Sequence, residues 1–170
     1  MCEEIPNIRA IKDWCGNPQQ REWHVRTLQS LPRPVNVLST HSTWLLSSLV
    51  LGCNGLLSGS GSVIPDLQSA LFRAVRSNDL EEARRINDRI YPLARVFYSE
   101  PWVDMHNRMK EALVLLGRRS APSCGRHASE TMRHASYRIV LAQCGVLVAS
   151  RHKSANKTKG GRVRGRPSPH

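Results

Sequence analysis

The sequence lacks closely spaced cysteines and long apolar runs, and each absence excludes a class of protein. Its five cysteines are scattered without any Cys-x2-Cys pair, so neither a disulfide framework nor a metal site is predicted. The longest apolar stretch, residues 44–51, is interrupted by Ser47 and Ser48, and acidic rather than basic residues lie near the N-terminus. We therefore expect no signal peptide, no membrane span and a cytoplasmic protein.

Acidic residues are scarce, 13 against 25 lysines and arginines, and the shortage is greatest at the C-terminus. Residues 151–170 contain seven basic side chains and no acidic one, and subtracting these seven from the net charge of +12 leaves +5. Such a run predicts a disordered basic tail. Residues 161–167 are similar to the core of AT-hook peptides, but aromatic residues are absent there. We expect only nonspecific, salt-sensitive contact with nucleic acid.

Short strands alternating with helices are predicted in the first 64 residues. The strand patterns lie at residues 8–12, 35–38 and 55–58. Helical segments begin at Pro18 and Trp44, the second capped by Ser42 or Thr43 and ended by a left-handed Gly52. Short loops between such elements indicate a parallel sheet with right-handed crossovers.

From Pro65 onward the spacing of apolar residues is helical only. One helix is predicted from Pro65 to Asn78, and a second is opened by a capping box of Asp79 and Glu82. A third follows within residues 102–117, and a less regular one within residues 130–147. Pro92 is expected to kink the second of these helices.

Two other patterns are too weak to predict a binding site. The glycine-rich residues 58–62 precede a helix, but they have neither the Walker lysine nor the spacing of a dinucleotide fingerprint, so a plain loop is predicted. Cys124, His127, His134 and Cys144 match no common zinc-finger spacing, and no metal is assigned to them.

Lys12 ends the first predicted strand and is the candidate for chemistry. An ammonium group is strongly hydrated, so a lysine at the end of a short apolar strand needs a reason to be there. One reason is a nucleophilic amine made available by desolvation, and catalytic groups in parallel barrels project from the C-terminal ends of strands. The pattern alone is also consistent with a lysine that has no chemical role and extends from the strand end into solvent.

Residues 5–13, Ile-Pro-Asn-Ile-Arg-Ala-Ile-Lys-Asp, resemble a sixth-strand motif of the dihydrodipicolinate synthase and N-acetylneuraminate lyase family of Schiff-base class I aldolases. Residues 37–39 resemble the seventh strand, and residues 51–58 resemble the Gly-x-x-Gly-x-Ile-Ser motif of the eighth. The pattern continues in order through Asp79, Glu100, Pro101, Lys110 and Gly117.

This resemblance covers residues 5–117 and implies an α/β fold, the C-terminal portion of a TIM (β/α)8 barrel. Residues 1–64 would hold strands six to eight with their helices. Residues 65–120 would hold the last barrel helix and a C-terminal helical bundle, and residues 121–150 a divergent helix. The basic tail at 151–170 lies outside the resemblance.

The resemblance also implies a lyase that acts on pyruvate or a related 2-keto acid. Lys12 would form the imine, and the main-chain carbonyl groups of Thr40 and Leu57 would line the substrate pocket. The imine itself is the electron sink, so no metal or organic cofactor is expected. Family members are commonly oligomers, which implies a homo-oligomer here.

Several features depart from the family and keep two alternatives open. Thr40 stands where a glycine is usual, and His41 and Ser42 replace a commonly acidic pair. The family's Gly-Thr-Thr-Gly-Glu loop and proton-shuttling tyrosine, which belong to the first half of the barrel, are absent here, and no tyrosine maps onto the latter. An amine alone can form an imine, but C–C chemistry also needs an acid/base group and a held carboxylate. The alternatives are a catalytically inactive truncated remnant and a small basic nucleic-acid-binding protein that acts through its tail.

Overall fold

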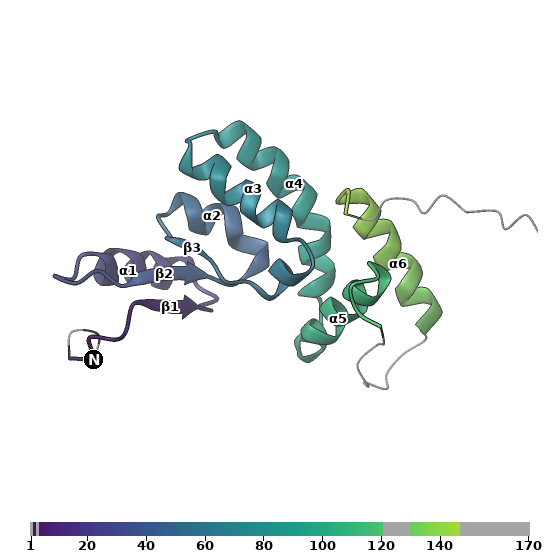
Figure 1. Ribbon diagram of the computed structural model, residues 1–170, viewed down its shortest axis with the longest axis horizontal. Coiled ribbons are helices and arrows are strands. Elements are labelled where there is room, and N and C mark those ends of the chain that lie inside the picture. The colour runs from purple at the N-terminus through teal and green to yellow at the C-terminus, as the bar shows by residue number, and fades with distance from the viewer. Residues whose placement is uncertain (1, 3, 121–129, 147–170) are drawn as a thin grey trace, which may run out of the picture.

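Three parallel strands form one sheet in the order β1, β2, β3 (Figure 1). The computed structural model describes residues 2, 4–120 and 130–146, and the side chains of residues 130–136 are not described. The strands are β1 (Ala10–Asp13), β2 (Asn36–Ser39) and β3 (Gly55–Leu56), joined through α1 (Pro18–Gln29) and α2 (Leu45–Val50). The predicted alternation of strands and helices and the parallel pairing are confirmed.

The two faces of this sheet differ in burial, because side chains alternate along a strand. Val37 is fully buried against Val25 of α1 on one face, and Asp13 is buried on the same side. On the opposite face Lys12 is exposed and its register partner, Leu38, is partly buried. Parallel sheets are usually covered on both faces. The described residues therefore leave the face that carries Lys12 largely open.

The remaining elements are helical and hold the larger core. They are α3 (Pro65–Arg76), α4 (Leu80–Phe97), α5 (Met105–Leu115), α6 (Glu130–Gln143) and the 3₁₀ helices η1 (Ser42–Trp44), η2 (Gly59–Ser62) and η3 (Trp102–Asp104). Helices α3 and α4 lie side by side (Figure 1). Leu71, Leu93 and Phe97 are fully buried between these helices and their neighbours. This packing carries the end of α4 to the C-terminal edge of the sheet.

One predicted helix cap is confirmed and another is wrong. The Asp79 carboxylate accepts a hydrogen bond from the Glu82 amide at 2.9 Å, as the capping box predicts. By contrast, α2 has no side-chain cap, because η1 precedes it and takes up both candidates. The hydroxyl group of Ser42 instead joins a buried cluster with Ser60 and Tyr98.

Some predictions concern residues that lie outside the described part of the chain. These residues are the predicted basic tail at 151–170 and residues 121–129, which include Cys124 and His127. Within the described ranges, no helix is long and apolar enough to cross a lipid bilayer.

Gly52 provides a test of the turn that leads into β3. Its φ is +106°, and a methyl group there would lie 3.3 Å from Cγ1 of Val25. Gly52→Ala is expected to lower the free energy of unfolding by about 1–3 kcal/mol in urea titrations, because the left-handed backbone disfavours a side chain. Gly16→Ala, where a methyl group meets nothing within 4 Å, is the matched control and should stay within about 0.5 kcal/mol. Equal losses would contradict this reading of the turn.

Candidate functional site

A pocket of about 250 Å³ lies where β1 and β2 end, between these strand ends and α5. Five parts of the chain contribute to it: the ends of the two strands, the start of η2, the residue after α4 and the first turns of α5. Its lining residues are Lys12, Trp14, Thr40, Gly59, Tyr98, Met105, His106 and Met109. The C-terminal ends of parallel strands are the usual place for a site in an open or closed α/β sheet.

The pocket brings together two of the three residues that the sequence singled out. Lys12 and Thr40 both line it, and the Thr40 amide donates to the Asp13 carbonyl oxygen at 3.2 Å. Leu57 follows β3, its amide donates to the Ser39 carbonyl oxygen at 2.8 Å, and its side chain is 51% exposed. Leu57 does not line the pocket.

Lys12 differs from expectation in its surroundings. A nucleophilic lysine was expected to be desolvated, yet the described residues leave this side chain exposed on the open face of the sheet. Because Lys12 alternates with the buried Asp13, the strand itself holds the amine on the pocket side. The described residues therefore place Lys12 in the pocket but do not bury it.

An aromatic stack forms one side of the pocket. The His41 ring stacks on Trp14, at 4.9 Å and 20°, and on Tyr98, at 4.8 Å and 20°, and the Trp14 and Tyr98 rings also approach each other, at 5.9 Å and 32°. Burial first, and then the nearby charge of Arg21, lower the pKa of His41. The imidazole is accordingly neutral near pH 7, and its Nδ1 atom lies 2.6 Å from the hydroxyl oxygen of Thr43.

The hydroxyl group of Tyr98 is held by a cluster of polar side chains beneath the pocket. It lies 2.9 Å from the Ser42 hydroxyl and donates to the Thr40 carbonyl oxygen at 3.5 Å. Ser42 also contacts the hydroxyl groups of Ser58 and Ser60, and Gln68 donates to Ser60 at 2.7 Å. These contacts fix the tyrosine, which is only 9% exposed.

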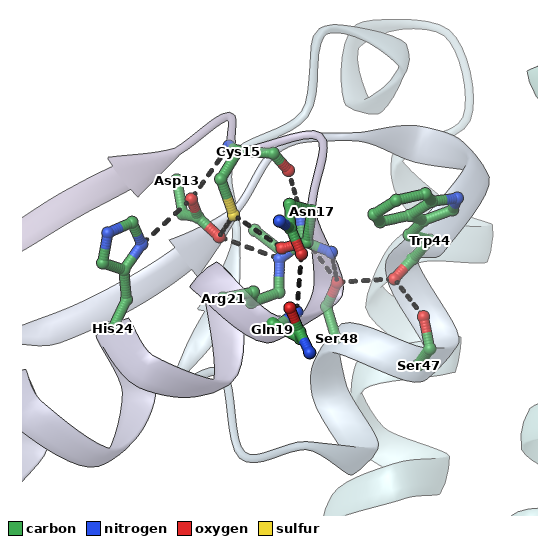
Figure 2. A network of polar contacts seen from close by, with 10 residues as sticks. Asp13, Cys15, Asn17, Gln19, Arg21, His24, Trp44, Ser47 and Ser48 are labelled. Carbon is green, nitrogen blue, oxygen red and sulfur yellow. Dashed lines mark hydrogen bonds and ion pairs between the residues drawn. The ribbon is translucent and has the colours of Figure 1, made fainter.

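On the other side of β1, Asp13 and Arg21 form a buried ion pair (Figure 2). Arg21 Nε donates to Asp13 Oδ2 at 2.8 Å, and both side chains are 1% exposed. The guanidinium group also donates to the Ser48 hydroxyl and to the Cys15 carbonyl oxygen, each at 2.9 Å. The pair therefore connects β1, α1 and α2.

Burial by itself would raise the pKa of Asp13, but its partners outweigh that effect. Hydrogen bonds from the Cys15 thiol and amide and from Arg21, together with the Arg21 charge, hold this pKa below its ordinary value. Burial and the neighbouring carboxylate raise the pKa of the Cys15 thiol. The carboxylate is thus ionised and the thiol protonated at neutral pH.

Asp13, Cys15 and His24 place potential metal ligand atoms within 4.8 Å of one another. The imidazole Nδ1 of His24 lies 3.4 Å from Asp13 Oδ1 (Figure 2). The Arg21 guanidinium, however, already occupies the other oxygen of this carboxylate, and its charge would repel a cation. We read the trio as part of the ion-pair network.

Several pocket residues were not among those predicted from the sequence. Trp14 carried a signal that could have been used, because it stands two residues after Lys12 and so falls on the same side of the chain. Tyr98, His106 and Met109 come from segments more than eighty residues away, and only the packing of α4 and α5 brings them to the strand ends.

The chain resembles known proteins of one family. The profile of the dihydrodipicolinate synthetase family matches residues 1–135. The chain is 32% identical over 121 residues to 4-hydroxy-tetrahydrodipicolinate synthase of Sorangium cellulosum, covering 71% of this chain and 38% of that protein. It is 27% identical over 100 residues to the probable 2-dehydro-3-deoxy-D-pentonate aldolase YjhH of Escherichia coli, covering 58% of this chain and 33% of that protein.

A solved structure agrees in fold. YagE of Escherichia coli K12, a prophage protein of the dihydrodipicolinic acid synthase family crystallised in complex with pyruvate, superposes with a TM-score of 0.72 at 24% identity. The match covers 86% of this chain and 49% of that protein. The chain thus spans about a third of the length of the curated relatives it matches and about half of this solved structure.

The buried ion pair predicts a large difference between two arginines of α1. Arg21→Ala leaves the Asp13 carboxylate buried and unpaired, so the free energy of unfolding should fall by about 3–5 kcal/mol. The matched control is Arg26→Ala, which removes an exposed pair with Glu22 and should cost about 0.5 kcal/mol or less. Urea titration measures both. Similar losses for the two variants would contradict a structural role for the Asp13–Arg21 pair.

The lowered pKa values of His41 and Asp13 predict loss of stability in acid. Each group binds a proton more readily in the unfolded chain, so the contribution of each is complete above its ordinary pKa, 6.5 for His41 and 3.8 for Asp13. Stability should therefore begin to fall below pH 6.5 and fall again below pH 3.8. In denaturant titrations at several pH values, His41→Phe should be less sensitive between these limits than the wild type. An identical slope for the two proteins would rule out this role of His41.

Proposed function

The chain belongs to the dihydrodipicolinate synthetase family, and from this premise we propose that it binds pyruvate or a related 2-keto acid as an imine on Lys12. One observation carries the proposal: Lys12 stands at the C-terminal end of β1, inside a pocket that Thr40 also lines. Family membership supports lyase chemistry in general. The pyruvate in the YagE crystals supports the choice of substrate class.

The first chemical step would need only the lysine and a proton from the solvent. The neutral Nζ atom attacks the keto carbon, one proton from the amine and one from the solvent leave with the former carbonyl oxygen as water, and the imine that remains keeps the second amine proton and is therefore positively charged. This cation withdraws electrons from the adjacent carbon, which is the role of an electron sink in aldol-type lyases. The chemistry up to this point requires no metal or organic cofactor.

We further propose that the sheet represents the last strands of a (β/α)8 barrel, with the Lys12 side as its inner face. The exposure of Lys12 and Asn36 on one face supports this assignment, because a closed barrel packs that side with further side chains. The order of strands and helices fits the same assignment. The cytoplasmic location and the homo-oligomeric state stay predictions.

Making or breaking a C–C bond would need more than the imine. A group must transfer a proton at the carbon next to the imine, and the carboxylate must be held in place. Besides Lys12 and Thr40, the lining residues whose side chains carry a hydroxyl group or an imidazole are Tyr98 and His106. Because imine formation needs only the amine of Lys12 and a solvent proton, it is the step that the pocket supports best.

Trapping with borohydride tests this function directly. The full chain is incubated with pyruvate and borohydride, and peptide mass spectrometry locates the reduced adduct. We expect the adduct on Lys12 and its loss in Lys12→Ala. Lys110→Ala, which removes a lysine of α5 outside the pocket lining, is the matched control and should be labelled like the wild type.

The opposite result has an equally clear meaning. A protein that circular dichroism shows to be folded, but that yields no adduct on Lys12, would contradict the proposed function. It would favour an inactive relative of the family's enzymes. Labelling spread evenly over several lysines would lead to the same conclusion, because a pocket lysine should react ahead of lysines elsewhere.

A further inference from the structure

The lining of the Lys12 pocket has an unusual chemical character for a site that handles small anions. Of its eight described lining residues, none is an aspartate, a glutamate or an arginine. Its basic nitrogen atoms are those of Lys12 and His106. The largest side chains are the rings of Trp14 and Tyr98 and the thioethers of Met105 and Met109. An anionic substituent far from the keto group would therefore find no arginine among these residues and, apart from Thr40 and His106, would meet aromatic and apolar side chains.

The aromatic side of this pocket is held firmly in place. Trp14 is 41% exposed and stacks on His41, which is only 7% exposed and stacks in turn on Tyr98. The Thr43 hydroxyl fixes the imidazole, and the Ser42 hydroxyl fixes the phenol. A surface of fixed ring planes is suited to binding another planar ring by stacking or edge contacts.

The thioether side can adapt to such a ring. A methyl group at position 59 would lie 3.0 Å from the Sδ atom of Met109, so the thioether packs directly on the Gly59 backbone. Methionine side chains are flexible and polarisable, and they make favourable contacts with aromatic rings. The pocket thus pairs a fixed aromatic side with an adaptable apolar side.

The size of the pocket points the same way. Pyruvate has only a methyl group beyond its keto carbon, so its imine on Lys12 would leave much of the volume of about 250 Å³ unfilled. Trp14 follows Lys12 by two residues and falls on the same side of the chain. A substituent that extends from the imine would therefore meet the Trp14 side of the pocket.

We propose that the preferred substrate is a 2-keto acid that carries an aryl group, bound as an imine on Lys12 with its ring between Trp14 and the methionines. The inference rests on the proposed function and specifies its substrate class. Phenylpyruvate is the simplest probe of this class. 2-Oxoglutarate, which places a second carboxylate where the ring would lie, is the opposite probe.

The experiment measures the half-saturating concentration of each keto acid for borohydride-trapped adduct on Lys12 of the full chain. Phenylpyruvate should half-saturate at a concentration about tenfold lower than pyruvate, and 2-oxoglutarate at a higher one than pyruvate. Trp14→Ala should reduce the preference for phenylpyruvate by about threefold or more, since one ring contact is lost. Trp14→Phe, which keeps a ring, should retain most of it.

Trp23→Ala is the matched control. Trp23 is 61% exposed on α1, outside the pocket lining, so its loss should leave the preference unchanged. The inference is overturned if pyruvate is trapped on Lys12 but phenylpyruvate is trapped no better, or if Trp14→Ala and Trp23→Ala give the same ratio. Absence of any adduct on Lys12, with pyruvate or phenylpyruvate, overturns the proposed function and this inference together. Trapping of pyruvate without a preference for phenylpyruvate overturns the inference alone, so the two failures can be told apart.

Discussion

The buried ion pair between Asp13 and Arg21 is the constraint on which the site depends. Asp13 and Lys12 are neighbours in β1, so fixing one on the helix-covered face fixes the other on the open face. A slip of one residue would exchange them and bury the amine. Because Arg21 also bonds to Ser48 and to the Cys15 carbonyl, the pair sets the positions of β1, α1 and α2 together.

The sequence could predict whatever depends on local pattern. Alternation and loop length predicted the three strands, and the capping box predicted Asp79 as the N-cap of α4. Contacts between segments far apart in the sequence could not be predicted from local pattern. Ser42 resembles a helix cap locally, yet its hydroxyl is used by Ser60 and Tyr98. Tyr98 enters the pocket only because α4 packs against α3 and ends beside the sheet.

The aromatic stack links the two sides of the structure. Arg21, which holds Asp13, also lies 5.3 Å from the centre of the Trp44 ring, and Trp44 stacks on His41 at 5.4 Å. The same charge helps to keep His41 neutral, so the imidazole can be buried against Trp14 and Tyr98. One arginine thus supports both the strand that presents Lys12 and the rings beside it.

Imine formation by Lys12 inside the pocket beside Thr40 and Tyr98 can be tested by a crystal structure of the chain after reaction with a 2-keto acid and borohydride. We expect continuous electron density from Lys12 Nζ to the former keto carbon, with the rest of the adduct between Trp14 and Met109. An adduct on another amine, or one on Lys12 that lies outside this pocket, would contradict it.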